Sequence, residues 1–164
     1  MTQPSVSPTL SFDDDTAQPG TLLVDLMATR DSVKELYRET LARFDLTEQQ
    51  WRVLSALSRC GTLDATRLAE RAALLPSSLT RILNSLEARG LIIAARDPMD
   101  ARRTVLSLGS AGRAMMAALT PEIDRIESRL RAALGAAQHD FLLHSLAHAR
   151  AALQDLHPPR GLRS

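Results

Sequence analysis

The stretch that decides the fold is residues 68–108, LAERAALLPSSLTRILNSLEARGLIIAARDPMDARRTVLSL. It predicts a helix, a tight turn, a second helix that starts near Pro76, and then two strands joined by a charged turn. Apolar residues of the second helix follow the i, i+3, i+4, i+7 spacing of one helix face. They are Leu79, Ile82, Leu83 and Leu86. Gly90 is placed to end this helix, as a glycine at C′ commonly does. This order of elements is that of a winged helix-turn-helix.

The opposite face of the second helix carries short polar and basic side chains, and we predict that it contacts DNA. These residues are Ser77, Ser78, Thr80, Arg81 and Asn84. Hydroxyl, amide and guanidinium groups reach base edges and phosphates from a helix in the major groove. The region is also locally basic: between Ser77 and Arg113 there are six arginines and three acids, although the formal charge of the chain is only +1. Such a local excess is typical of a surface that contacts phosphates.

Composition favours a mainly α protein with a small β-hairpin, an α+β arrangement. Hydrophobic residues make up 45% of the 164 residues and aromatic residues only 3%, so the core is rich in Leu and Ala. The single cysteine, Cys60, excludes an intramolecular disulfide and a cysteine-clustered zinc site. His144 and His148 have helical i, i+4 spacing but no acidic or cysteine companion, so we expect no metal and no cofactor. Without a membrane-length apolar run or a secretion signal, we expect a cytoplasmic protein with no membrane partner.

Helices on both sides of the winged unit predict a homodimer. In the predicted helix 110–134, apolar residues step by three and four like the a and d positions of a heptad, with Pro121 expected to bend or break it. A last helix over 138–156 has the same stepping. This is more apolar surface than the small unit covers, and a two-fold dimer places two recognition helices about 34 Å apart, on a palindromic operator. We therefore divide the chain into a disordered tail (1–20), dimerisation helices (21–45 and 110–156), a DNA-binding lobe (46–109) and a flexible tail (157–164).

Two residues before the winged unit have two interpretations each. Arg30 lies on the apolar stripe of the predicted helix 21–44, where it either extends to water or pairs with an acid, or else binds an anionic ligand. Trp51 lies in the predicted helix 46–60, which opens with a capping box of Thr47 and Gln50. It is either a core anchor or a stacking wall for an aromatic ligand. The helix that follows, over 62–73, has Thr62 or Asp64 as its cap.

The chain resembles the MarR (multiple antibiotic resistance regulator) family of bacterial transcription factors. The resemblance covers nearly all of residues 21–156 and rests on three motifs in order: LTEQQWRVL, LAERAALLPSSLTRILNSLEARGLI and RDPMDARRTVLSLGSAGRA. The first motif, with Arg30 before it, is most similar to the homoprotocatechuate degradation regulator subgroup. The resemblance implies a homodimeric repressor that leaves its operator when a small molecule binds.

The family pattern also implies roles for individual residues. Arg102 and Arg103 correspond to the wing arginine that enters the minor groove of DNA, and Asp97 and Asp100 would orient them or belong to an ordinary turn. In the subgroup the effectors are phenolic acids, so Arg30 would grip a carboxylate with two hydrogen bonds. The remaining expected effector contacts are Trp51 with Tyr37 or Phe44 as aromatic wall, Gln49 or Gln50 as polar partner, and Arg38 as an alternative anchor. Cys60 does not match the cysteine of the oxidant-sensing branch.

The leading hypothesis is therefore a repressor of an aromatic catabolic operon that a phenolic carboxylic acid releases from double-stranded DNA. The alternatives are a winged-helix regulator of efflux or stress and a winged-helix module that binds proteins without a small-molecule ligand. An enzyme is not expected, because the chain has no nucleophile–base constellation and no phosphate-binding loop.

Overall fold

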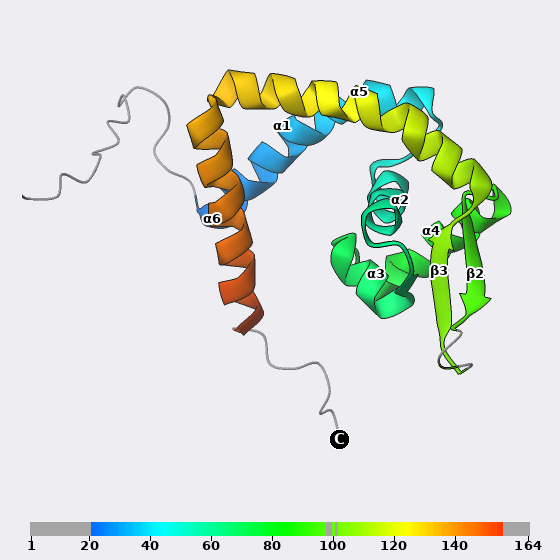
Figure 1. The fold of residues 1–164 in the computed structure, drawn as a ribbon. Helices are drawn as coiled ribbons and strands as arrows, with labels where there is room; N and C mark the ends of the chain where they lie inside the picture. Colours follow the sequence, from blue (N-terminus) through cyan, green and yellow to red (C-terminus); the bar gives the residue numbers. More distant parts are fainter. Residues whose placement is uncertain (1–20, 98–99, 101, 156–164) are drawn as a thin grey trace, which may run out of the picture. The chain divides into compact units, whose positions relative to one another are not determined.

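The computed structural model describes residues 21–97, 100 and 102–155, so the tails predicted for residues 1–20 and 157–164 lie outside the described residues. The described chain confirms the mainly α fold with a small β wing (Figure 1). Its elements in order are α1 (Leu22–Arg43), α2 (Glu48–Cys60), β1 (Leu63–Asp64), α3 (Ala65–Arg71), α4 (Pro76–Ala88), β2 (Ile92–Arg96), β3 (Thr104–Leu108), α5 (Ser110–Leu134) and α6 (Ala136–Asp155).

The chain divides into two compact units, and the boundary lies between Lys34 and Glu35, inside α1. The described part of the first unit, residues 21–34, is the first half of that helix. Most of its apolar side chains, including Leu22, Leu23 and Met27, are exposed. The second unit holds the second half of α1 and all the other elements.

Local capping signals place the helices before the wing. The Thr47 hydroxyl accepts from the Gln50 backbone N–H (3.2 Å), and the Gln50 side chain accepts from the Thr47 backbone N–H (2.9 Å), which confirms the capping box. Of the two caps considered for α3, Asp64 is the one used: its carboxylate accepts from the Arg67 backbone N–H at 2.8 Å. Gly90 follows the end of α4 with φ +65°, a left-handed conformation that costs glycine little.

The wing consists of β2, β3 and the turn between them, and it is the outer part of a three-stranded antiparallel sheet. The strand order is β1-β3-β2, and Ile92 pairs with Leu108 at the base of the wing. The two-residue strand β1 was not predicted from the sequence; it pairs Leu63 with Leu106 and Asp64 with Val105. The core beneath joins α2, α3, α4, β2 and α5 through fully buried Leu54, Leu57, Leu68, Leu86, Ile92 and Leu119.

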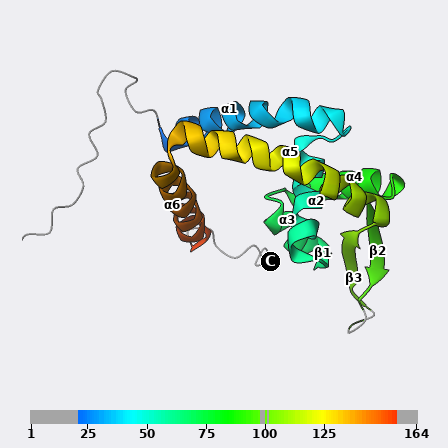
Figure 2. The same ribbon diagram turned by 45° about the horizontal axis from the view of Figure 1, so that its top comes forward.

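The helix α5 runs without interruption through Pro121, so of the two expected effects of this proline, a bend or a break, the break is absent. Its first turn meets the α4–β2 turn backbone to backbone. A Cβ added at Gly112 would lie 1.9 Å from the Leu91 carbonyl oxygen, and one added at Gly109 would lie 2.4 Å from that of Gly90. Only glycine allows so close an approach. Figure 2 shows α2, α3, α4 and the sheet gathered at this end of α5.

At its other end, α5 gives way to α6 at Gly135, whose φ is +80°. The apolar residues of α6 are exposed within the single chain, among them Phe141, Leu142, Leu143, Leu146 and Leu153. The same helix carries the heptad stepping expected from the sequence. An apolar face left uncovered by its own chain is available to a partner.

Candidate functional site

Helix α4 presents the polar face that was predicted to contact DNA. Leu79, Ile82 and Leu86 are buried on its inner side, which fixes the orientation of the helix. On the other side Ser77, Thr80, Arg81 and Asn84 are exposed, and Ser78 is half-buried. The helix starts at Pro76, whose missing N–H costs nothing at this position. The structure thus brings the predicted base-contacting residues together on one open helix face.

Hydrogen bonds among Asp97, Asp100, Arg102 and Arg103 fix the turn between β2 and β3. The Asp97 N–H donates to the Arg103 carbonyl (2.9 Å), and the Arg103 N–H donates to the Asp100 carbonyl (2.9 Å). The Asp100 carboxylate accepts from the Arg102 backbone N–H at 3.0 Å. Asp100 therefore orients the backbone at Arg102. The exposed Arg102 guanidinium makes no ion pair with any residue that the structure describes.

The neighbouring Arg103 differs, because its guanidinium is bound to Asp64. The Nη2–Oδ2 distance is 2.5 Å, and the exposed fractions of the side chains are 55% for Arg103 and 18% for Asp64. The Arg67 backbone N–H, and then the Arg103 side chain, hold the pKa of the Asp64 carboxyl below its ordinary value, against the opposing effect of desolvation. Asp64 was expected from the sequence only as a candidate cap; its position beside the wing depends on the unpredicted strand β1.

Two residues of the predicted aromatic wall contact each other where α1, α2 and α5 meet. The rings of Tyr37 and Trp51 stack, with centroids 5.1 Å apart and planes inclined by 28°. The Tyr37 hydroxyl donates a short hydrogen bond to the Glu127 carboxylate on α5. Burial raises the pKa of the Tyr37 phenol well above its ordinary value, and the hydrogen bond and charge of Glu127 add to the effect. Glu127 is a member of this cluster that the sequence analysis did not identify.

The other candidate effector residues are spread over the surface. In the first unit Arg30 is exposed and forms an ion pair with Asp31 (3.2 Å). Arg38 is exposed and pairs with Glu35 at 2.6 Å. Phe44 is half-buried and Gln49 is exposed, whereas Gln50 donates to the Ser85 hydroxyl on α4 at 3.1 Å. Of the predicted effector residues, the second unit therefore brings only Tyr37 and Trp51 into a ring contact.

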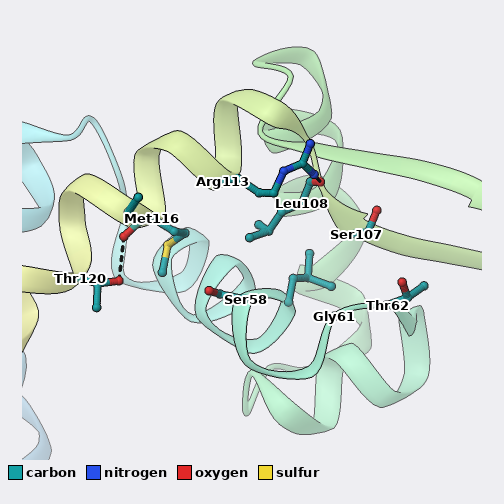
Figure 3. Close-up of a pocket in the computed structure, with 10 residues that line it drawn as sticks. Ser58, Gly61, Thr62, Ser107, Leu108, Arg113, Met116 and Thr120 are labelled. Atoms are coloured by element: carbon teal, nitrogen blue, oxygen red, sulfur yellow. Dashed lines mark hydrogen bonds between the residues drawn. The ribbon is translucent and has the colours of Figure 1, made fainter.

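A separate hollow of about 460 Å³ lies between the end of α2, β3 and the start of α5 (Figure 3). Leu57, Leu108 and Met116 form its apolar part, with hydroxyl groups such as that of Ser58 around it. The Arg113 guanidinium beside it donates to the Leu108 carbonyl at 2.6 Å. This bond ties the corner between β3 and α5. None of the predicted effector residues lines the hollow.

Two further structural features bear on the expectations from the sequence. Among the described residues, no three His, Cys, Asp or Glu side chains are arranged to hold a metal ion. Within the same part of the chain, every helix is too short or too polar to cross a membrane.

The known proteins that this chain resembles include transcriptional repressors. A family model described as the MarR family matches residues 44–103. The homoprotocatechuate degradative operon repressor of Escherichia coli is 31% identical over 125 residues, which are 76% of this chain and 84% of the repressor. The structure of NadR in complex with 4-hydroxyphenylacetate is similar, with a TM-score of 0.72 and 30% identity over 82% of this chain and 95% of NadR. The structure of CouR bound to a 23-mer DNA duplex has a TM-score of 0.71 and 32% identity over 79% of this chain and 92% of CouR.

Proposed function

The chain belongs to the MarR family of DNA-binding transcriptional regulators, and from this membership we propose that it is a homodimeric repressor released from a palindromic operator by a phenolic carboxylic acid. The genes that it controls would then encode enzymes that degrade an aromatic acid. The repressor of the homoprotocatechuate operon and the 4-hydroxyphenylacetate complex of NadR support this class of effector.

In the DNA complex, bases in the major groove would be contacted by Ser77, Ser78, Thr80, Arg81 and Asn84. The four exposed members of this set can approach DNA without rearrangement of the core, since the helix is held by its opposite face. Arg102 or Arg103 would enter the adjacent minor groove, where the narrow, electronegative channel attracts a guanidinium. That CouR has been solved bound to a DNA duplex supports the proposal that this chain binds double-stranded DNA.

The observation that carries the effector part of the proposal is the stacked pair of Tyr37 and Trp51 at the junction of α1, α2 and α5. An aromatic ligand that binds there would contact the helices that form the dimer and the lobe that contacts DNA. Arg30 remains the proposed partner of the ligand carboxylate, with Arg38 as the alternative. To release the operator, the ligand must bind the DNA-free arrangement of the dimer more tightly by a few kcal/mol.

A second copy of the chain is the proposed partner of the exposed apolar faces. Leu142, Leu146 and Leu153 recur on α6 at the spacing of a helix that packs along another helix, yet each is exposed in the single chain. The first unit adds the exposed apolar residues of α1. Dimerisation would place the two α4 helices at the spacing of successive major grooves.

The test has two steps. The wild-type protein first selects a duplex from a randomised library, and its binding to that duplex is then measured by gel shift. We expect selection of a two-fold symmetric site, a dimer by light scattering, and release on addition of 4-hydroxyphenylacetate but not of benzyl alcohol, which has no carboxylate. Selection of an asymmetric site by a monomer would refute the dimer. Unchanged binding with a panel of phenolic acids would refute the effector class while leaving the DNA-binding role intact.

A further inference from the structure

The position of Asp64 assigns different roles to the two adjacent wing arginines. Asp64 belongs to β1 and caps α3, so it lies where the wing meets the helix-turn-helix. Its carboxylate binds the Arg103 guanidinium. We propose that Asp64 is a positioning residue that fixes the orientation of the wing by binding Arg103. Arg102, and not Arg103, is then the arginine that contacts the minor groove.

Two residue pairs, Leu63 with Leu106 and Asp64 with Val105, are all that connect β1 to the wing strand β3. So short a ladder restrains the direction of a hairpin weakly. The ion pair adds a contact two residues beyond this ladder, because Arg103 precedes Val105, the last paired residue of β3, by two positions. Asp64 is itself fixed by the bond from the Arg67 backbone N–H, so the wing is held against the first turn of α3.

If the Arg103 guanidinium moved into a DNA groove, the Asp64 carboxylate would lose its partner close to the phosphate backbone. With the pair intact, the two charges cancel and the base of the wing presents little net charge there. The exposed Arg102 has no such restraint on its side chain, while its backbone N–H is held by Asp100.

Asp64→Asn gives a sharp test, because asparagine caps a helix about as well as aspartate but carries no charge. If Asp64 were only an exposed acid near DNA, removing its charge would tighten binding to every DNA sequence. If Asp64 positions the wing, the variant loses affinity for the selected duplex, while its affinity for unrelated DNA stays equal or rises because one negative charge is gone. The two explanations therefore predict opposite signs for the selected duplex.

The experiment measures fluorescence anisotropy of the full chain on the selected duplex and on a scrambled duplex of equal length, at several salt concentrations. We expect the ratio of the two affinities to fall roughly thirtyfold in Asp64→Asn, which corresponds to the loss of one specific contact, at the low end of its usual strength, at each of the two half-sites. Hydroxyl-radical protection should weaken in the minor grooves that flank the α4 contacts, with the melting temperature unchanged. An unchanged ratio, or tighter binding to both duplexes, would overturn the proposal.

A double-mutant cycle separates positioning from an independent contact. Asp64→Asn should have no further effect on the ratio in an Arg103→Ala background, because both changes break the same pair. Arg102→Ala should lower the ratio in either background. If Arg103→Ala and Asp64→Asn act additively, Arg103 contacts DNA directly and the assignment is wrong. Because non-specific binding is measured in the same series, these outcomes do not depend on the proposed effector.

Discussion

Replacing Tyr37 with phenylalanine removes one hydroxyl group and leaves the ring that stacks on Trp51. The lost bond is one from a buried phenol to a carboxylate, a class worth about 1.5–3 kcal/mol. Glu127 is exposed, so its carboxylate regains water when the phenol is absent. We therefore expect the free energy of unfolding at pH 7 to fall by about 1 kcal/mol, below the lower end of that range.

The difference should reverse at high pH. The folded-state pKa of Tyr37 is raised, chiefly by burial, while in the unfolded chain the phenol titrates near 10. The stabilisation is therefore complete below pH 10. Above it, the unfolded wild type releases a proton that the folded state keeps, so wild-type stability falls by up to about 1.4 kcal/mol per pH unit. The phenylalanine variant lacks this loss, and the two stability curves should cross between about pH 10.5 and 11.

Two optical signals make the measurement direct, because Tyr37 is the only tyrosine and Trp51 the only tryptophan of the chain. Urea unfolding followed by Trp51 fluorescence gives the stability of both proteins at each pH, at one fixed protein concentration, since a dimer's stability depends on concentration. Tyrosinate absorbance of the native wild type gives the titration itself. A native titration near pH 10, or stability curves that stay parallel above it, would refute the reasoning.

Four further predictions concern DNA, effector, packing and assembly. Arg81→Ala should weaken gel-shift affinity for the selected duplex about tenfold or more while light scattering still finds a dimer; wild-type affinity would contradict its role. Arg30→Ala should bind the same duplex but no longer release it with 4-hydroxyphenylacetate, and an unchanged response would make Arg30 structural. Gly112→Ala places a Cβ against the Leu91 carbonyl oxygen and should cost about 1–3 kcal/mol in urea unfolding; a stability equal to wild type would mean that this contact relaxes. Phe141→Glu should raise the dimer dissociation constant in sedimentation, and no change would exclude this part of α6 from the interface.

Features that depend on neighbours in the sequence were predictable. The spacing of Leu79, Ile82 and Leu86 gave the buried side of α4 and hence its polar side. The Thr47–Gln50 capping box and the turn at Gly90 rest on residues within one turn of each other, and both are confirmed. Local rules of this kind need no knowledge of the rest of the fold.

Features that join distant segments were not predictable. Arg103 and Asp64 are 39 positions apart, and Tyr37 and Glu127 are 90 apart, so nothing in the local pattern of either residue identifies its partner. The acids predicted to orient the wing arginines were those nearest in sequence, whereas the carboxylate on the Arg103 side chain comes from another element. The strand β1 was missed because two residues are too few for any periodicity to appear.

The contact of Gly109 and Gly112 with the α4–β2 turn has a consequence for signalling. Elsewhere in a protein, side chains between two elements change rotamer and absorb small displacements, but here backbone meets backbone with nothing between. The Gly109 N–H also donates to the Leu91 carbonyl at 2.9 Å. We therefore expect a shift of α5, the proposed dimerisation helix, to reach the end of α4, the proposed DNA-contacting helix, with little loss, because no side chain between them can absorb it.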